Sequence, residues 1–204
     1  QPGDGNHDPA ADLNATITVH PRDLDVFADA ASRPYGHANP PLTVHYGAFA
    51  YDDNASSLGA QPYAHTAATA SSPTGTYEVN ATGGASPDYH FVYHGSILSV
   101  GTSGQSIASF VPDLNATYGA LPLELNATAT SGLPVGYSSS NPDVLEVNGT
   151  RLHIRGAGQA TIHAHQPGDG NHDPAADLNA TITVHPRDLD VFADAASRPY
   201  GHAN

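Results

Sequence analysis

Residues 1–39 read QPGDGNHDPAADLNATITVHPRDLDVFADAASRPYGHAN, and residues 166–204 repeat this stretch without a substitution. Because Gln166 matches Gln1, the period of the repeat is 165 residues, and a fixed period is the signature of an array of structural modules. We therefore expect the chain to be a window on a longer tandem array, with both ends inside modules. The alternative is one duplicated segment in an otherwise ordinary protein.

The repeated stretch contains a β-strand pattern, in which Ile17 and Val19 alternate with Thr18 and His20. The same period of two recurs farther along, as in Ala160, Ile162 and Ala164, and it indicates strands with one buried face. Turn signals such as Gly83-Gly84, Asn141-Pro142 and Asn148-Gly149 separate the runs. Short strands with regular turns predict an all-β fold. We expect tandem antiparallel β-sandwich (Ig-like) modules, about two in each 165-residue period.

Two modules fit into one period, the first over residues 22–100 and the second over residues 102–185. Both open alike, with Tyr35-Gly36 before Leu42 in the first and Tyr118-Gly119 before Leu123 in the second. Residues 1–20 are then the tail of a preceding second-type module, and residues 187–204 begin a following first-type module. The linkers are very short, which predicts a semi-rigid rod.

Several stretches carry a family resemblance. Leu24–Leu42 (LDVFADAASRPYGHANPPL) and Gly75–Val100 (GTYEVNATGGASPDYHFVYHGSILSV) resemble the start and the end of a YGX-type MBG-like domain. Ser131–Ala175, beginning SGLPVGYSSSNPDVLEVNGT, resembles a bacterial Ig-like repeat. The resemblance implies an MBG-like β module followed by an Ig-like β-sandwich module, of the kind found in large extracellular surface, adhesin and fibre proteins. It implies little about a ligand, because a fold does not by itself give a function.

Composition excludes several classes of partner. The formal net charge is −14 with no basic patch, so the chain should repel nucleic acid and anionic membranes. No stretch approaches 18 consecutive apolar residues, so we expect no membrane insertion. Cys and Lys are both absent, which excludes disulfides and Lys–Asn isopeptide cross-links. The stability of the modules must therefore come from packing.

The strongest chemical signal is a set of N-glycosylation sequons. Asn-X-Ser/Thr occurs at Asn14, Asn54, Asn80, Asn115, Asn126, Asn148 and Asn179, which are seven of the 12 asparagines. Random placement would give about two such motifs. The excess favours N-linked glycans on an extracellular chain, although the abundance of Asn, Ala and Thr is the plain alternative.

Weaker constellations do not support a metal site or catalysis. Asp4–Asp8, repeated as Asp169–Asp173, has oxygen ligands at alternate positions like a calcium loop, but it lacks the glycine and the final glutamate of an EF-hand. His163 and His165 share a strand face, and we expect His153 on the partner strand, where three imidazoles could meet, although a solvated polar face is the preferred interpretation. No nucleophile elbow surrounds Ser138–Ser140. We predict no catalytic residue, no metal site and no cofactor, with calcium as the exception to test.

The preferred hypothesis is a structural repeat unit of a secreted, N-glycosylated extracellular filament or surface stalk. Its expected location is the cell surface, and its expected partner is itself, through head-to-tail neighbouring modules and fibre assembly. One alternative is an adhesin repeat that binds a glycan or a host protein, which predicts an exposed apolar or aromatic patch in every period. Another is a non-catalytic spacer of a larger extracellular enzyme.

Overall fold

The computed structural model describes the chain apart from residues 1, 2, 4, 9, 10, 12, 109, 111–114, 196, 198, 199 and 202–204. The chain divides into two compact units, Gln1–Gly101 (unit 1) and Thr102–Asn204 (unit 2). Among the described residues the single helix is a 3-10 turn, η1 at Ala55–Ser57, and every other regular element is a strand. The predicted all-β fold is confirmed.

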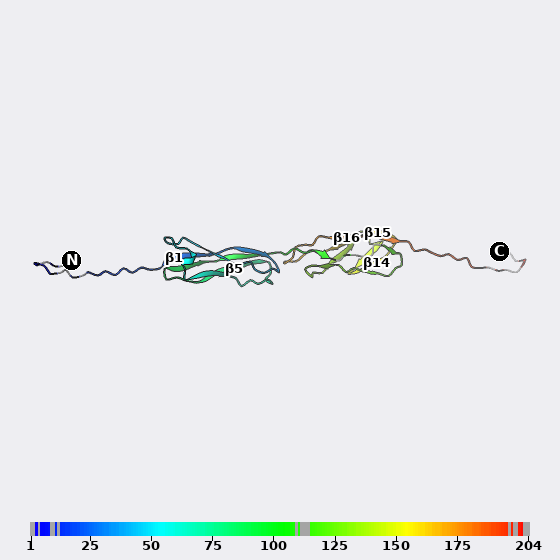
Figure 1. Ribbon diagram of the computed structural model, residues 1–204. Helices are drawn as coiled ribbons and strands as arrows, with labels where there is room; N and C mark the ends of the chain where they lie inside the picture. The colour runs from blue at the N-terminus through cyan, green and yellow to red at the C-terminus, as the bar shows by residue number, and fades with distance from the viewer. Residues whose placement is uncertain are drawn as a thin grey trace. The chain divides into compact units, whose positions relative to one another are not determined.

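The described residues of unit 1 form two sheets. Its strands are β1 (Arg22–Ala28), β2 (Ala31–Pro34), β3 (Val44–Tyr46), β4 (Ala60–His65), β5 (Gly75–Ala85), β6 (Tyr89–His94) and β7 (Ser96–Gly101). One sheet has the order β3-β1-β6, and the other has the order β2-β7-β5-β4. Figure 1 labels β1 and β5, one from each sheet.

The core of unit 1 lies between its two sheets. On β1, Val26 alternates with exposed Asp25 and is fully buried. Val26 shares one apolar cluster with Val79 of β5 and Leu98 of β7, which belong to the other sheet. Because side chains from two sheets interdigitate in one cluster, unit 1 is a β-sandwich.

The described residues of unit 2 contain nine strands. They are β8 (Ile107–Ala108), β9 (Asn115–Thr117), β10 (Leu123–Glu124), β11 (Thr128–Ala129), β12 (Gly136–Ser139), β13 (Leu145–Asn148), β14 (Arg151–Ile154), β15 (Gly158–His165) and β16 (Leu178–His185). They form a sheet of order β12-β15-β16-β9, a sheet of order β10-β14-β13, and the pair β11-β8. Figure 1 labels β14, β15 and β16.

The core of unit 2 confirms the alternation predicted for β15. Ala160, Ile162 and Ala164 are all at most 2% exposed. Ile162 packs in one cluster with Leu152 of β14 and Ile182 of β16. Since β14 belongs to the opposite sheet, unit 2 is also a sandwich.

Pairing within the sheets is mixed. Most ladders are antiparallel, as predicted, but β1 pairs with β6, β2 with β7 and β16 with β9 in parallel. Parallel neighbours need a crossover connection, and no local turn signal in the sequence reports it. The parallel pairs therefore arise from the way the chain returns to each sheet, and the turn motifs alone do not reveal them.

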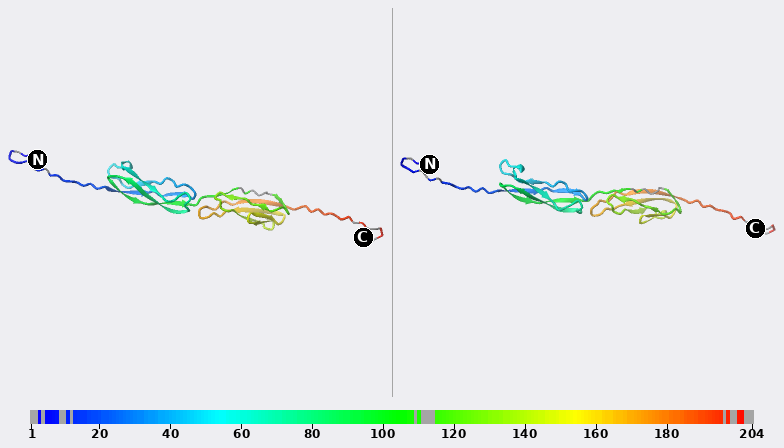
Figure 2. Two further views of the ribbon diagram at one scale, coloured as in Figure 1. Left: turned by 90° about the horizontal axis from the view of Figure 1, so that it is seen from below. Right: turned by 60° about the horizontal axis from the view of Figure 1, so that its bottom comes forward.

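The two copies of the repeat have different structures. Leu178–His185 forms β16 in unit 2, whereas the identical residues 13–20 run extended, pair with no strand among the described residues, and lead into β1 (Figure 2). In the same way residues 22–28 form β1, whereas the identical residues 187–193 form no strand. The assignment of residues 1–20 and 187–204 to neighbouring modules stays a prediction.

Candidate functional site

All seven sequon asparagines have exposed side chains. Three lie in unit 1 and four in unit 2: Asn14 before β1, Asn54 before η1, Asn80 on β5, Asn115 on β9, Asn126 between β10 and β11, Asn148 at the end of β13, and Asn179 on β16. Side chains on a strand alternate between the core and the outer face, so a sequon asparagine on a strand is exposed only where its side chain points outward. The side-chain amides are therefore accessible to a modifying enzyme.

Two of the sequons have defined local geometry. The Asn54 side chain caps η1, where its Oδ1 accepts a hydrogen bond from the backbone N–H of Ser56 at 3.0 Å. Asn179 lies opposite His163 in the β15–β16 ladder, with His163 Nδ1 2.6 Å from Asn179 Oδ1. Both contacts use the side-chain oxygen, so Nδ2, the atom that carries an N-linked glycan, is left for modification.

The placement of His153 beside His163 and His165 was wrong. His153 lies on β14, whose partners are β10 and β13, whereas His163 and His165 lie on β15 between β12 and β16. The two strands are consecutive in the chain but belong to opposing sheets, because the turn that follows Ile154 crosses from one sheet to the other. Consecutive strands are usually adjacent in a sheet, and this pair is an exception.

The loop Asp169–Asp173 uses a carboxylate to hold a turn. Asp169 Oδ1 accepts hydrogen bonds from the backbone N–H groups of Asn171 and His172, both at 2.8 Å, and lies 2.9 Å from Nδ1 of His172. These contacts lower the pKa of Asp169, and the hydrogen bond from the backbone N–H of Asn171 has the largest effect. Within the described residues no group of three His, Asp or Glu side chains is arranged to hold a metal, and Asp4 of the first copy lies outside them.

An aromatic and acidic face on unit 1 escaped the sequence analysis. The Phe27 ring of β1 is stacked between His45 of β3 and His94 of β6, with ring centroids 5.0 Å and 4.4 Å away. His45 Nδ1 lies 2.6 Å from Asp29 Oδ1, and His94 Nε2 lies 2.7 Å from Asp25 Oδ1. Asp23, Asp25 and Phe27 lie on the same outward face of β1. This could have indicated the face, but the neighbouring strands that supply the histidines were not predictable. Such exposed side-chain contacts contribute less than about 1 kcal/mol each.

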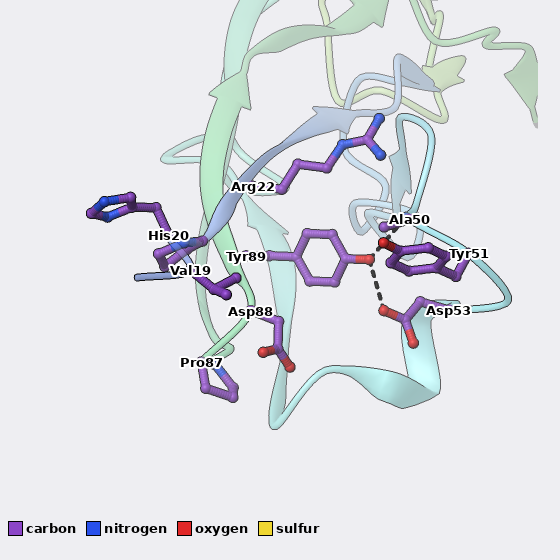
Figure 3. A pocket seen from close by; sticks show the side chains of 10 residues that line it. Val19, His20, Arg22, Ala50, Tyr51, Asp53, Pro87, Asp88 and Tyr89 are labelled. Carbon is purple, nitrogen blue, oxygen red and sulfur yellow. Dashed lines mark hydrogen bonds between the residues drawn. The ribbon is translucent and has the colours of Figure 1, made fainter. Parts of the chain in front are cut away.

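Unit 1 also has an open pocket of about 670 Å³ beside the buried ring of Tyr89. The Tyr89 hydroxyl donates to Asp53 Oδ2 at 2.8 Å and accepts from the backbone N–H of Ala50 at 2.9 Å (Figure 3). Burial, above all, raises the pKa of Tyr89, so the phenol remains a donor. The hydroxyl ties the loop that contains Ala50 and Asp53 to β6, which makes Asp53 a structural carboxylate.

Tyr89→Phe should loosen this loop selectively. The substitution keeps the ring, which packs edge-on against Phe49 at 5.7 Å between centroids, but it removes both hydrogen bonds of the hydroxyl. We expect the Ala50 amide to exchange its hydrogen several-fold faster, because it loses its acceptor. Hydrogen–deuterium exchange measures this, with Tyr93→Phe on the same strand as the control that leaves the loop unchanged. Unchanged exchange at Ala50 in Tyr89→Phe would contradict the assignment.

Comparison with known proteins confirms the predicted family resemblance. Residues 24–99 match the family model of the MBG domain (YGX type). This match lies within unit 1 and covers less than half of the chain. No curated protein matches the sequence.

Some solved structures resemble the chain at low identity and with low TM-scores. The immunoglobulin domains 1–5 of Sidekick-1 are 14% identical, over 78% of this chain and 38% of that one, with a TM-score of 0.37. Drosophila N-cadherin EC1-4 is 7% identical, over 82% and 52%, with a TM-score of 0.32. The C-terminal fragment of intimin, solved with the intimin-binding domain of the translocated intimin receptor, is 16% identical, over 84% and 64%, with a TM-score of 0.30. The chain thus spans less than two thirds of each of these structures.

Proposed function

We propose that this chain is a structural repeat unit of a secreted, N-glycosylated extracellular filament or surface stalk. The observation that carries the proposal is the perfect repeat of 165-residue period, read together with the structure. The repeated residues supply β1 and β2 at the start of unit 1 and β16 at the end of unit 2. One period therefore encodes one module of each kind, and an array would alternate the two.

The positions of the sequons support a glycan coat. They are exposed and occur in both units, so that glycans would cover both kinds of module. Exposed sheet edges tend to pair with other chains, and Lys is one residue with which many proteins prevent this. The chain has no Lys, and bulky hydrated glycans would serve the same purpose.

The charge and the fold support a mechanical role rather than a catalytic one. A net charge of −14 keeps the molecules apart in solution. The charged groups described above, Asp53 and Asp169, each hold a loop through hydrogen bonds. In the part of the chain that the structure describes, no helix is long and apolar enough to cross a membrane.

Peptide mass spectrometry on native material tests the coat. We expect added hexose-type mass on most of the seven sequon asparagines. Asn39, Asn141 and Asn171, which lie outside sequons, are internal controls and should be bare. An Asp-directed protease is needed because the chain has only six Arg and no Lys. If the asparagines of all seven sequons are unmodified, the proposed N-glycosylation is wrong.

An adhesin repeat is the second candidate, favoured by one feature of unit 1. The side chains of Tyr63 and Tyr93 are 60% and 41% exposed. Gly83 lies under the Tyr63 ring, where an added Cβ would meet it at 2.7 Å, and its carbonyl accepts from the Tyr93 hydroxyl. Exposed aromatic rings held in this way are suited to contact a partner. If the sequons are bare, an unmodified adhesin stalk becomes the better account.

A further inference from the structure

A surface hollow of about 420 Å³ lies at the edge of the β2-β7-β5-β4 sheet of unit 1, where β4 ends. The ladder between β4 and β5 stops at the pair His65–Asn80, so β4 offers no partner to residues 75–79 of β5. Beyond His65 the chain continues through Thr66 and two alanines, whose small side chains leave the space beside β5 open. The hollow thus follows from where β4 stops and from the residues that come after it.

Asn80, the asparagine of a sequon, forms part of the wall of this hollow. Its side chain is exposed, and its amide oxygen Oδ1 is turned toward Gly95, where an added Cβ would lie 3.2 Å from it. Gly95 directly precedes β7, which flanks β5 on the side opposite β4. The nitrogen Nδ2, which carries an N-linked glycan, is therefore on the β4 side of the amide, toward the hollow.

The wall offers the kinds of contact that a sugar ring uses. Thr76 and Glu78 are exposed on the same face of β5 as Asn80, because side chains two apart on a strand point the same way. In the part of the chain that the structure describes, no hydrogen bond or ion pair engages the side-chain carboxylate of Glu78. This carboxylate is available to accept charge-assisted hydrogen bonds from sugar hydroxyls. The imidazole of His65 adds an exposed ring beside them.

We propose that the hollow seats the first sugar of an N-linked glycan on Asn80. The inference rests on the proposed N-glycosylation of the chain. A sugar attached at Asn80 is held beside the wall at an effective concentration on the order of millimolar. Contacts too weak to capture a free sugar therefore suffice for the tethered one. The seated sugar covers the edge of β5 that β4 leaves open, and so it keeps that edge from pairing with another chain.

The test measures how fast an amidase that hydrolyses the bond between glycan and asparagine acts on the folded chain. The full chain is produced in a secretory host that adds N-glycans. Mass spectrometry follows each site separately, because release converts the asparagine to aspartate. The seated sugar must leave the wall before the enzyme can act, so we expect release at Asn80 to be several-fold slower than at Asn148. That reference site stands at the end of β13, in the β13–β14 hairpin.

Two variants change the wall and leave the sequon intact. Ala67→Leu fills the hollow with a larger side chain, and Glu78→Ala removes the carboxylate. Both residues are exposed, so neither change disturbs the core. We expect each to raise the release rate at Asn80 several-fold, with the rate at Asn148 unchanged. Ala70→Leu, on the same loop but outside the wall, is the control and should change neither rate.

The outcomes separate this proposal from the glycan coat. If the glycan is present on Asn80 but neither Ala67→Leu nor Glu78→Ala accelerates its release, the seat is wrong and the coat stands. Equal acceleration by Ala70→Leu would overturn the seat in the same way. An unmodified Asn80 beside occupied sequons elsewhere also removes the seat alone. Unmodified asparagines at all seven sequons would overturn the coat and the seat together.

Discussion

Leu24→Ala should lower the free energy of unfolding of unit 1 by about 2–5 kcal/mol. Leu24 lies on β1, is 1% exposed, and packs against Leu58 and Tyr89. Removing its side-chain atoms loses their transfer free energy and leaves a cavity, because both neighbours are held by other contacts. Tyr89 in particular is fixed by its hydroxyl, which reduces the collapse that could fill the space.

The chain supplies a matched control for this substitution. Leu189 has the same sequence neighbours as Leu24, but it is 86% exposed. Leu189→Ala should therefore change stability by less than about 0.5 kcal/mol. Unfolding in urea is followed by hydrogen exchange of peptides from unit 1. Equal losses in the two variants would show that the two copies do not differ in burial as described.

Arg33→Lys, a substitution that keeps the charge, should cost unit 1 about 2–4 kcal/mol. Arg33 is 6% exposed on β2. Its Nε donates to Asn39 Oδ1 at 2.6 Å, and its two terminal nitrogens donate to the carbonyls of Pro34 and Thr69. Asn39 in turn donates to the Ala68 carbonyl at 2.6 Å. The planar guanidinium thus joins two loops to β2.

A lysine cannot reproduce this arrangement. Its ammonium group is a single point with three donors and cannot reach acceptors that lie around a plane, so buried acceptors would lose their partners. The control is Arg155→Lys, since Arg155 forms an exposed pair with Glu146 and its side chain is 58% exposed. That change should cost less than about 1 kcal/mol. Unfolding in urea compares the two, and an Arg33→Lys loss as small as the control would disprove the buried role.

Much of the local structure was predictable from particular residues. The alternation of Ala160, Ile162 and Ala164 indicated both the strand β15 and its buried face, because side chains on a strand alternate between two environments. The parallel pairing of β16 with β9 and the stack of Phe27 on two histidines were not predictable. Each requires strands that are distant in sequence to become neighbours.

His153 illustrates the limit of sequence reasoning. Its strand precedes β15 with only a short turn between them, and hairpin pairing was the natural expectation. The turn instead crosses to the opposing sheet, since β14 pairs with β13 and β10 while β15 pairs with β12 and β16. Which strands pair is decided by the total burial of the sandwich, and a local pattern does not contain that information.

The two copies of the repeat show what the sequence determines and what the tertiary structure determines. The sequence by itself determined the period of 165 residues, the strand pattern of TITVH and the side of the strand on which Ile17 and Ile182 both lie. Only the tertiary structure decided that Ile182 is 0% exposed and Ile17 is 86% exposed. The physical reason is that burial belongs to a side chain together with its neighbours. Ile182 has β15 and the opposite sheet beside it, whereas no strand among the described residues lies beside Ile17.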